Sequence, residues 1–388
     1  MKASYDFLIV GAGFSGLSFA VQASTQLKAK CLVVDSRPHI GGNAYDYYDE
    51  AGILIHAYGP HYFRTNSPKI QSFLSQFTDW RAVEYQIRSF SEGRYWNFPI
   101  NLNTFEQLIG RPSDTAEMES WLEQKRVPIA NPRNSEEVII SQVGWELYEK
   151  FFKNYTIKQW NKHPSELDAS VCGRIPIRTN RDDRYLVESF QALPSEGYTK
   201  MFERMLVASG PHCELQLNTD FRDVMERVKY GHLVYTGQID AFFDYCYGDL
   251  PYRSLRFERE SFVGAALDER LPISGKRGFW QPAVQVNYPN SEQFTRIVEL
   301  KHATGQISNA TTIVREYPKE FKRGGEPFYP IPNSESALVY KQYKNLADQC
   351  VKTSFIGRLA TYRYYNMDQV VGMALAEFDR IRGTWRRE

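Results

Sequence analysis

The chain opens with two apolar runs of strand length, separated by a segment whose apolar positions follow the period of a helix. The first run covers residues 6–10 and the second covers residues 31–34. Continuous apolar runs of this length are typical of strands buried on both faces of a parallel sheet. The pattern therefore predicts a βαβ unit at the N-terminus, and with it an α/β fold.

Further along the chain the pattern changes twice. Residues 84–100 alternate between apolar and polar positions around a Glu92-Gly93 turn, which predicts a β-hairpin. From 102 to about 160 the apolar spacing is helical, whereas residues 252–318 alternate without long helices between the strands. A helical segment and a separate sheet are thus expected to interrupt the α/β domain. Shorter helices are expected at residues 67–80, at 197–206 and after 366, and further strands at 213–217, 233–235 and 353–356.

The turn after the first apolar run carries the motif G-x-G-x-x-G, formed by Gly11, Gly13 and Gly16. In this motif the first glycine permits a tight turn, and the second lets the backbone approach a pyrophosphate. The third lets the helix pack closely on the strand. The helix N-terminus adds free N–H groups and the positive end of its dipole. Asp35 follows the second run, where a carboxylate can accept a hydrogen bond from a ribose hydroxyl. Strand, helix, strand and acid in this order predict a dinucleotide site rather than a chance glycine turn.

Composition narrows the class of partner. The 388 residues include 47 basic and 46 acidic side chains, so no overall field favours nucleic acid or a membrane surface. No apolar stretch reaches the roughly 20 residues that span a bilayer, and the N-terminus lacks the pattern of a secretion signal. Five scattered cysteines without C-x-x-C spacing favour reduced thiols and indicate no metal site. We therefore expect a cytoplasmic protein of two or three domains.

The residues after Asp35 refine the expected dinucleotide. Arg37 and the pair Gly41-Gly42 form an R-x-x-x-G-G pattern, which favours flavin-binding chains over simple nicotinamide dehydrogenases. Together with residues 58–66, YGPHYFRTN, they make the chain resemble the UDP-galactopyranose mutase family of bacterial type over nearly its whole length. Residues 58–66 are similar to the family motif G-A/P-H-x-F-H-T-N. His61 matches that motif, and Arg64 stands where the family usually has histidine.

The resemblance implies a discontinuous Rossmann-like FAD-binding domain with an inserted helical domain and an antiparallel β-sheet domain. The FAD-binding domain would comprise residues 1–83, 186–245 and 331–388. Residues 101–185 would form the helical domain with a mobile loop. Residues 246–330 would form the antiparallel sheet on the substrate side, to which residues 84–100 would add strands. The implied cofactor-binding residues are Gly11, Gly13, Phe14, Ser15, Gly16, Asp35, Arg37, Gly42, Asn43, His61, Gly357, Arg358 and Met367.

Two arginines are implied as a clamp on a substrate diphosphate, Arg174 in a polar loop and Arg296 on an alternating strand. A guanidinium can hold two phosphate oxygens at once, which lysine cannot. Without the resemblance, Arg174 reads as a solvated loop charge and Arg296 as an outward-facing strand charge. The resemblance makes both catalytic, together with His61. The implied substrate-binding residues are Phe152, Tyr155, Thr156, Trp160, Tyr185, Asn287, Tyr329, Tyr364, Asn366 and Arg64, with Tyr155 stacking on uracil and the three later tyrosines donating hydroxyls to the diphosphate.

The activity that the resemblance implies is the interconversion of UDP-galactopyranose and UDP-galactofuranose, for the biosynthesis of a cell-wall or surface polysaccharide. N5 of reduced FAD would attack the anomeric carbon without net redox change. The chain shows no Ser-His-Asp order and no paired-carboxylate signature, which fits chemistry carried by a cofactor. UDP-sugars are the expected partners, without nucleic acid or membrane, and the expected assembly is a homodimer or larger homo-oligomer.

Three alternatives stay open at this point. An FAD-dependent amine oxidase-like oxidoreductase shares the N-terminal fingerprint, but its substrate would reduce the flavin. A non-catalytic module could bind a flavin or a nucleotide sugar without turnover. Finally, the permanent cation of Arg64 could widen the tolerance for the sugar, so that UDP-N-acetylgalactosamine is accepted as well.

Overall fold

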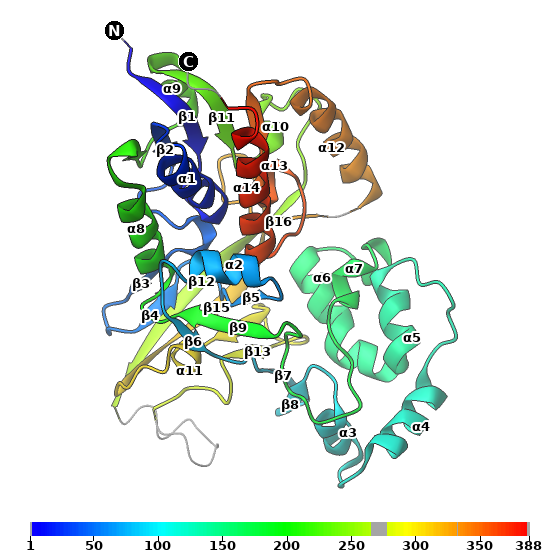
Figure 1. Cartoon of the computed structure of the whole chain (residues 1–388). Helices are drawn as coiled ribbons and strands as arrows, with labels where there is room; N and C mark the ends of the chain where they lie inside the picture. Colours follow the sequence, from blue (N-terminus) through cyan, green and yellow to red (C-terminus); the bar gives the residue numbers. More distant parts are fainter. Residues whose placement is uncertain (1, 265–277, 332, 386–388) are drawn as a thin grey trace.

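The computed structural model describes residues 2–264, 278–331 and 333–385. Two large sheets and a group of helices form its three parts, and the helical part, cyan to teal in Figure 1, projects to one side of the sheets. In the described part of the chain no helix is long and apolar enough to cross a bilayer. The same residues contain no cluster of side chains suited to hold a metal ion.

A five-stranded parallel sheet contains the predicted N-terminal βαβ unit. Its strand order is β10-β2-β1-β11-β17, and every neighbouring pair is parallel. Leu8 lies opposite Leu32 on one side and Leu233 on the other, so apolar side chains continue across the sheet. The Rossmann-like fold and its assembly from distant chain segments are confirmed. The strands are β1 (Ser4–Val10), β2 (Cys31–Val34), β10 (Cys213–Gln216), β11 (Lys229–Tyr235) and β17 (Thr353–Phe355).

Three helices cover this sheet next to one another: α1 (Phe14–Gln26), α8 (Tyr198–Ser209) and α14 (Met367–Arg382). Buried aromatic rings fill their contacts, with Phe14 against Phe202 and Phe19 against Phe378. The carboxylate of buried Asp46 accepts hydrogen bonds from the first two N–H groups of α8, which have no partner inside the helix. Helix α1, which follows the glycine turn, is thus held in place by α8 and α14.

A seven-stranded sheet forms the second layer, in the order β16-β12-β15-β14-β13-β7-β8. All described neighbours are antiparallel except β13 and β7, which run parallel; the hairpin β7-β8 comes from an earlier part of the chain than the other strands. Residues 265–277 of the expected sheet segment lie outside the described residues. The strands are β7 (Ile87–Ser91), β8 (Arg94–Phe98), β12 (Tyr252–Val263), β13 (Gln285–Asn287), β14 (Arg296–Val298), β15 (Ala310–Glu320) and β16 (Tyr329–Pro330).

The helical part follows the hairpin, as the spacing predicts. Asn101, Asp114 and Asn134 each begin a helix by accepting a backbone N–H with their side chain. Gly144 interrupts the longest helix of this part, Ser135–Tyr148, with φ 75°, where an added Cβ would overlap the Lys125 carbonyl. The elements are α3 (Leu102–Ile109), α4 (Thr115–Lys125), α5 (Ser135–Tyr148), the π-helical turn η2 (Glu149–Lys153), α6 (Asn154–Trp160), η3 (Pro164–Glu166) and α7 (Ser170–Gly173).

The helix expected over residues 67–80 is shorter, since α2 spans only Pro68–Leu74. The chain turns after Leu74 because β6 (Trp80–Ala82) must pair with β9 (Phe190–Pro194) in a small sheet completed by β5 (Phe63–Thr65). The remaining elements are η1 (Gly42–Ala44), β3 (Asp46–Tyr48), β4 (Leu54–His56), η4 (Gly210–His212), α9 (Phe221–Arg227), α10 (Ile239–Phe242), α11 (Lys301–Thr304), α12 (Ser334–Ala347) and α13 (Gly357–Ala360).

Candidate active site

An elongated pocket, the dinucleotide cradle, lies at the carboxyl end of β1 and the start of α1. Most predicted cofactor residues line it: Gly11, Gly13, Phe14, Ser15, Asp35, Arg37, Gly42, Asn43, His61, Arg358 and Met367. Gly16 and Gly357 lie behind the lining. A Cβ on Gly16 would overlap the Gly11 carbonyl, and a Cβ on Gly357 would come 2.7 Å from Ser15 Oγ. These two glycines allow close packing behind the cradle and do not form part of its surface.

The floor of the cradle is bare backbone. A Cβ on Gly42 would come 3.2 Å from the Cα of Gly13, so the two glycine segments approach each other without side chains between them. Gly11 adopts φ 105°, and its Cβ position is filled by Thr236 Oγ1, which donates a hydrogen bond to the Val10 carbonyl. Such a surface lets the N–H groups at the start of α1 reach a pyrophosphate.

Gly11→Ala is expected to abolish retention of the dinucleotide, because its methyl group overlaps Thr236 and its φ is unfavourable for alanine. Gly52→Ala is the matched control. It shares a positive φ of 71° but has nothing within 4 Å of the new Cβ, so only strain of about 1 kcal/mol is expected. The measurement is the ratio of bound cofactor to protein after gel filtration. Equal ratios in the two variants would contradict this description of the cradle.

Two carboxylates, those of Asp35 and Glu326, fix the backbone and the Arg37 side chain at one end of the cradle. Asp35 accepts backbone hydrogen bonds from Ala12 and Arg37, at 2.8 and 2.9 Å. The Arg37 guanidinium is paired with Glu326, donates to Asn43 and lies over the Tyr58 ring. Arg37 thus lines the cradle as predicted, with its charge balanced by a residue that sequence reasoning missed. Glu326 comes from the loop before β16, and only the fold brings it to Arg37.

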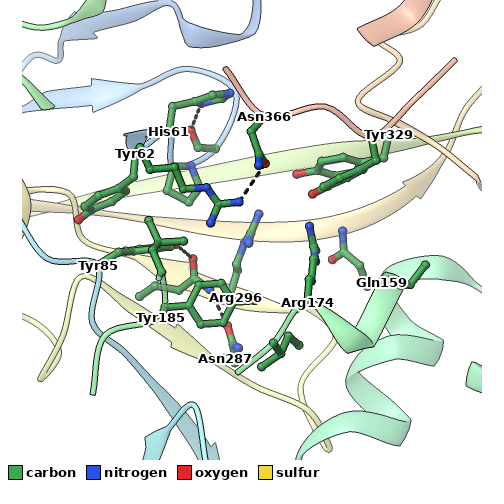
Figure 2. Close-up of a pocket in the computed structure, with 18 of the residues that line it drawn as sticks. His61, Tyr62, Tyr85, Gln159, Arg174, Tyr185, Asn287, Arg296, Tyr329 and Asn366 are labelled. Carbon is green, nitrogen blue, oxygen red and sulfur yellow. Dashed lines mark hydrogen bonds between the residues drawn. The ribbon is translucent and has the colours of Figure 1, made fainter. Parts of the chain in front are cut away.

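A second pocket, the arginine pocket, adjoins the cradle and shares four lining residues with it: His61, Arg358, Asn366 and Met367. Four arginines line the arginine pocket (Arg64, Arg174, Arg296 and Arg358), and among its described lining residues there is no carboxylate. Figure 2 shows Arg174 and Arg296 next to each other, with both guanidinium groups pointing to the same side of the pocket. Concentrated positive charge in a concave site attracts anionic ligands.

The arginine pocket brings together all but one of the predicted substrate and catalytic residues. Phe152 is the exception, since it is buried behind the lining and packs against Phe98. Arg174 ends α7 and is exposed to the open pocket. The other predicted residues in the lining are His61, Arg64, Tyr155, Thr156, Trp160, Tyr185, Asn287, Arg296, Tyr329, Tyr364 and Asn366.

Arg296 is held by a buried acid. Its Nε donates to Glu316 Oε2 at 2.7 Å, across directly paired positions of β14 and β15, and Glu316 is fully buried. Burial opposes charging of Arg296, but the attraction of Glu316 and of the neighbouring tyrosines together outweighs it and raises the pKa of the arginine. Arg296 is therefore a permanent cation with a fixed orientation, which is what binding of a phosphate requires.

His61 is uncharged where the two pockets meet. Burial, and then the neighbouring His56 and two arginines, lower the pKa of His61 to about 3. The Gly59 carbonyl lies 2.8 Å from Nδ1, the hydrogen bond drawn at His61 in Figure 2, and this fixes the proton on Nδ1. Nε2 is left as an acceptor. His61 can therefore orient a donor at this position but cannot supply a proton near neutral pH.

Arg64 is fixed at two points. Its Nη2 donates to Asn366 Oδ1 at 2.9 Å, and its Nε lies 3.5 Å from Glu188 Oε1. Both members of the Arg64–Glu188 pair are about four-fifths buried, so their interaction is only partly screened by solvent. Glu188 cannot be identified from the sequence, since it precedes β9 and reaches Arg64 only through the pairing of β9 with β5.

Several further lining residues carry no sequence signal of their own. Tyr62 and Tyr85 stack with ring centroids 4.1 Å apart, and the Tyr85 hydroxyl donates to Gln285. Both tyrosines and Gln159 are labelled in the wall of the pocket in Figure 2. In the sequence they look like ordinary buried or half-buried positions, so only the fold could reveal them.

Comparisons with known proteins agree with this arrangement. A family model described as UDP-galactopyranose mutase matches residues 150–364, and one described as NAD(P)-binding Rossmann-like domain matches residues 9–77. The chain is 34% identical over 380 residues to a probable UDP-galactopyranose mutase of Klebsiella pneumoniae, covering 97% of this chain and 94% of the relative. It is 32% identical over 378 residues to dTDP-fucopyranose mutase of Escherichia coli, covering 95% and 96%.

Solved structures show the same fold at lower identity. A crystal structure of reduced UDP-galactopyranose mutase superposes with a TM-score of 0.76 at 16% identity, covering 99% of this chain and 96% of that one. A putrescine oxidase superposes with a TM-score of 0.59 at 14% identity, covering 99% and 100%. The class of protein is thus an isomerase built on a Rossmann-like nucleotide-binding domain. The chain belongs to the UDP-galactopyranose mutase family, because the family model covers more than half of it and a relative above 30% identity spans nearly all of it.

Proposed function

We propose that the protein interconverts UDP-galactopyranose and UDP-galactofuranose with the help of reduced FAD. The observation that carries the proposal is the arginine pocket, lined by four arginines without a carboxylate among its described residues and sharing a wall with the dinucleotide cradle. A nucleoside diphosphate bound to these arginines places its sugar toward the shared residues, at the end of the cradle. The family membership supports the same assignment.

The cradle fits FAD. Its bare glycine floor suits a pyrophosphate, Asp35 is placed for a ribose hydroxyl, and the opposite end reaches His61 and Met367, which also line the arginine pocket. When bound there, reduced FAD supplies the nucleophile for the anomeric carbon, without net redox change. Gly11, Gly13 and Gly42 would contact its pyrophosphate, and Arg358 and Met367 would lie beside the flavin end.

The protein's own residues hold the nucleotide throughout. Arg174 and Arg296 balance the diphosphate charge while UDP is part of the sugar nucleotide and after it has left. Holding UDP close keeps its return an intramolecular event, and proximity of this kind can lower a barrier by about 7–11 kcal/mol in favourable cases. Tyr155, Thr156 and Trp160, all on α6, form the wall on which the uracil and the sugar would rest.

Charge argues against an amine oxidase-like reaction. A cationic amine would have to enter a pocket whose wall carries four guanidinium groups and, among the described residues, no carboxylate to pair with it. The structural likeness to putrescine oxidase concerns the fold alone. An anionic nucleotide sugar gains from the same charges, which favours the mutase over this alternative.

The chain is nearly as similar in sequence to dTDP-fucopyranose mutase as to the probable UDP-galactopyranose mutase. A dTDP-hexose is therefore the second candidate substrate. The discriminating experiment purifies the protein, identifies the released cofactor by chromatography, and compares turnover of UDP-galactofuranose with that of a dTDP-hexofuranose. The proposal expects FAD and preferred turnover of the UDP-sugar. Preferred turnover of the dTDP-sugar would transfer the assignment to the second candidate.

Arg64 is proposed to widen sugar tolerance, so that UDP-N-acetylgalactosamine is accepted alongside UDP-galactose. Asn366 and Glu188 fix its guanidinium in the wall of the pocket, where its extra donors can meet an acetamido oxygen. Arg64→His is expected to lower the rate on the N-acetylated sugar several-fold more than the rate on UDP-galactose. An unchanged ratio of the two rates would show that position 64 does not set this specificity.

A further inference from the structure

Tyr364 occupies an unusual place in the arginine pocket, with two guanidinium groups close to its ring. The Arg174 guanidinium carbon lies 4.6 Å from the centroid of the Tyr364 ring, and that of Arg358 lies 5.3 Å from it. The Tyr329 ring stacks on Tyr364 with centroids 5.4 Å apart. Contacts of this kind between a cation and an aromatic face are attractive, and they strengthen when water is excluded.

Arginines of the pocket differ in how their charge is balanced. Arg296 pairs with Glu316, and Arg64 lies near Glu188. Both glutamates lie behind the residues that line the pocket. Arg358 donates hydrogen bonds to the Tyr365 and Phe328 carbonyls, and neither Arg358 nor Arg174 forms an ion pair with a carboxylate in the described part of the chain. Among the described residues, these two guanidinium groups therefore have no anionic partner. Both of them face Tyr364.

The surroundings of Tyr364 set its ionisation. Burial alone would raise the pKa of Tyr364, but Arg174, Arg358 and Arg296 together lower it to about 8. Tyr329, stacked on it, moves in the other direction, since burial and the neighbouring Tyr364 raise its pKa to about 12. The charged or titratable groups facing Tyr364 are Arg174 at the end of α7, Arg358 on α13, Arg296 on β14 with Glu316 behind it on β15, and Tyr329 on β16.

We propose that in mildly alkaline solution the Tyr364 phenolate serves as an internal anion for the arginines of the pocket, and that it takes up one proton when a nucleotide diphosphate replaces it. The inference rests on the proposed function and concerns how the same site exchanges its anion. The proton passes from solvent to Tyr364 Oη, and no covalent bond other than this O–H forms or breaks. The protonated hydroxyl then becomes a donor to a phosphate oxygen, whereas a phenolate would repel it.

The sign of the pH dependence follows from the proton uptake. Below the pKa of about 8 the hydroxyl is already protonated, and binding needs no proton. Above it, binding competes with loss of the proton, so affinity falls as pH rises. For a single proton this amounts to about a tenfold increase in Kd between pH 7 and pH 9.

The test is titration calorimetry of UDP-galactose into the holoenzyme with oxidised FAD, where the ligand binds without turnover. Measurements near pH 8.5, about half a unit above the pKa, in two buffers of different ionisation enthalpy give the number of protons taken up. Wild type is expected to take up most of one proton. Tyr364→Phe is expected to take up almost none and to show a nearly flat pH profile of Kd between pH 7 and pH 9.

Tyr340→Phe is the matched control. Tyr340 lines neither pocket and burial raises its pKa, so removal of its hydroxyl should leave the proton uptake equal to that of wild type. Lys158 also titrates near pH 8, but it donates to the Tyr288 and Phe294 carbonyls and does not line the pocket.

Binding by wild type without proton uptake, or equal uptake in Tyr364→Phe, would overturn this inference and leave the proposed function intact. Absence of binding to wild type would instead contradict the proposed function, and the inference with it. Bound FAD after gel filtration verifies that each variant is folded, and the wild-type pH profile tests the inference without any variant.

Discussion

Arg174→Ala is expected to lower kcat/KM by at least about 100-fold while FAD stays bound. Two hydrogen bonds to a charged diphosphate contribute about 3 kcal/mol or more together, and about 1.4 kcal/mol corresponds to each tenfold loss in rate. Arg174 lines the arginine pocket but not the dinucleotide cradle, so loss of its side chain leaves the cradle unchanged. Steady-state kinetics together with the ratio of FAD to protein measures both effects.

Arg181→Ala is the matched control for this variant. Arg181 lies seven positions further along the same polar segment, but it is half-exposed, pairs with Glu106 and does not line the pocket. Surface pairs contribute little, so near-wild-type kinetics are expected. Arg174→Lys should retain part of the activity, because it keeps the charge but loses the second hydrogen bond. Wild-type turnover by Arg174→Ala would refute the clamp and favour a solvated loop charge.

Arg296→Ala is expected to remove activity and also to destabilise the protein. The variant leaves the Glu316 carboxyl fully buried and without its cation, where burial already raises its pKa, so it either stays charged at a cost or takes up a proton. Breaking a buried pair in this way typically costs about 3–5 kcal/mol. A clear fall in the midpoint of thermal unfolding is therefore predicted for Arg296→Ala and not for Arg174→Ala, although both arginines line the same pocket.

A double variant separates the two effects of Arg296. Arg296→Ala combined with Glu316→Ala removes the stranded carboxylate, so it should recover part of the lost thermal stability without recovering activity. Thermal unfolding followed by circular dichroism, together with turnover of UDP-galactofuranose, gives both readouts. Unchanged stability in the single variant would show that Glu316 does not depend on Arg296 for its charge balance.

The features that the sequence could predict are those that depend on neighbouring residues. The apolar runs around Gly11 and Asp35 specify a βαβ unit locally, and Glu92-Gly93 specifies a hairpin in the same way. The end of α2 at Leu74 could not be predicted from its spacing, because it is set by pairing of residues 80–82 with a strand more than a hundred positions later. Helical spacing alone cannot indicate where such a long-range pair stops a helix.

The residues of the candidate site also divide into those that the sequence could identify and those that only the fold brings to the site. The glycine turn is recognisable from its motif, and Arg174 and Arg296 from the family resemblance; the fold brings them to adjoining pockets. Glu316, Glu188 and Glu326 act behind or opposite a recognised arginine, and each reaches it through strand pairing or a loop from another part of the chain. Phe152 shows the converse, since the family resemblance implied a place in the pocket while the packing puts the ring against Phe98.

The most direct measurement of the central claim compares turnover of UDP-galactofuranose by the FAD-loaded protein before and after reduction with dithionite. A reaction that depends on reduced FAD predicts conversion to UDP-galactopyranose only by the reduced protein, with many turnovers for each flavin reduced. Equal turnover by oxidised and reduced protein, or bleaching of oxidised FAD by the sugar nucleotide itself, would contradict it.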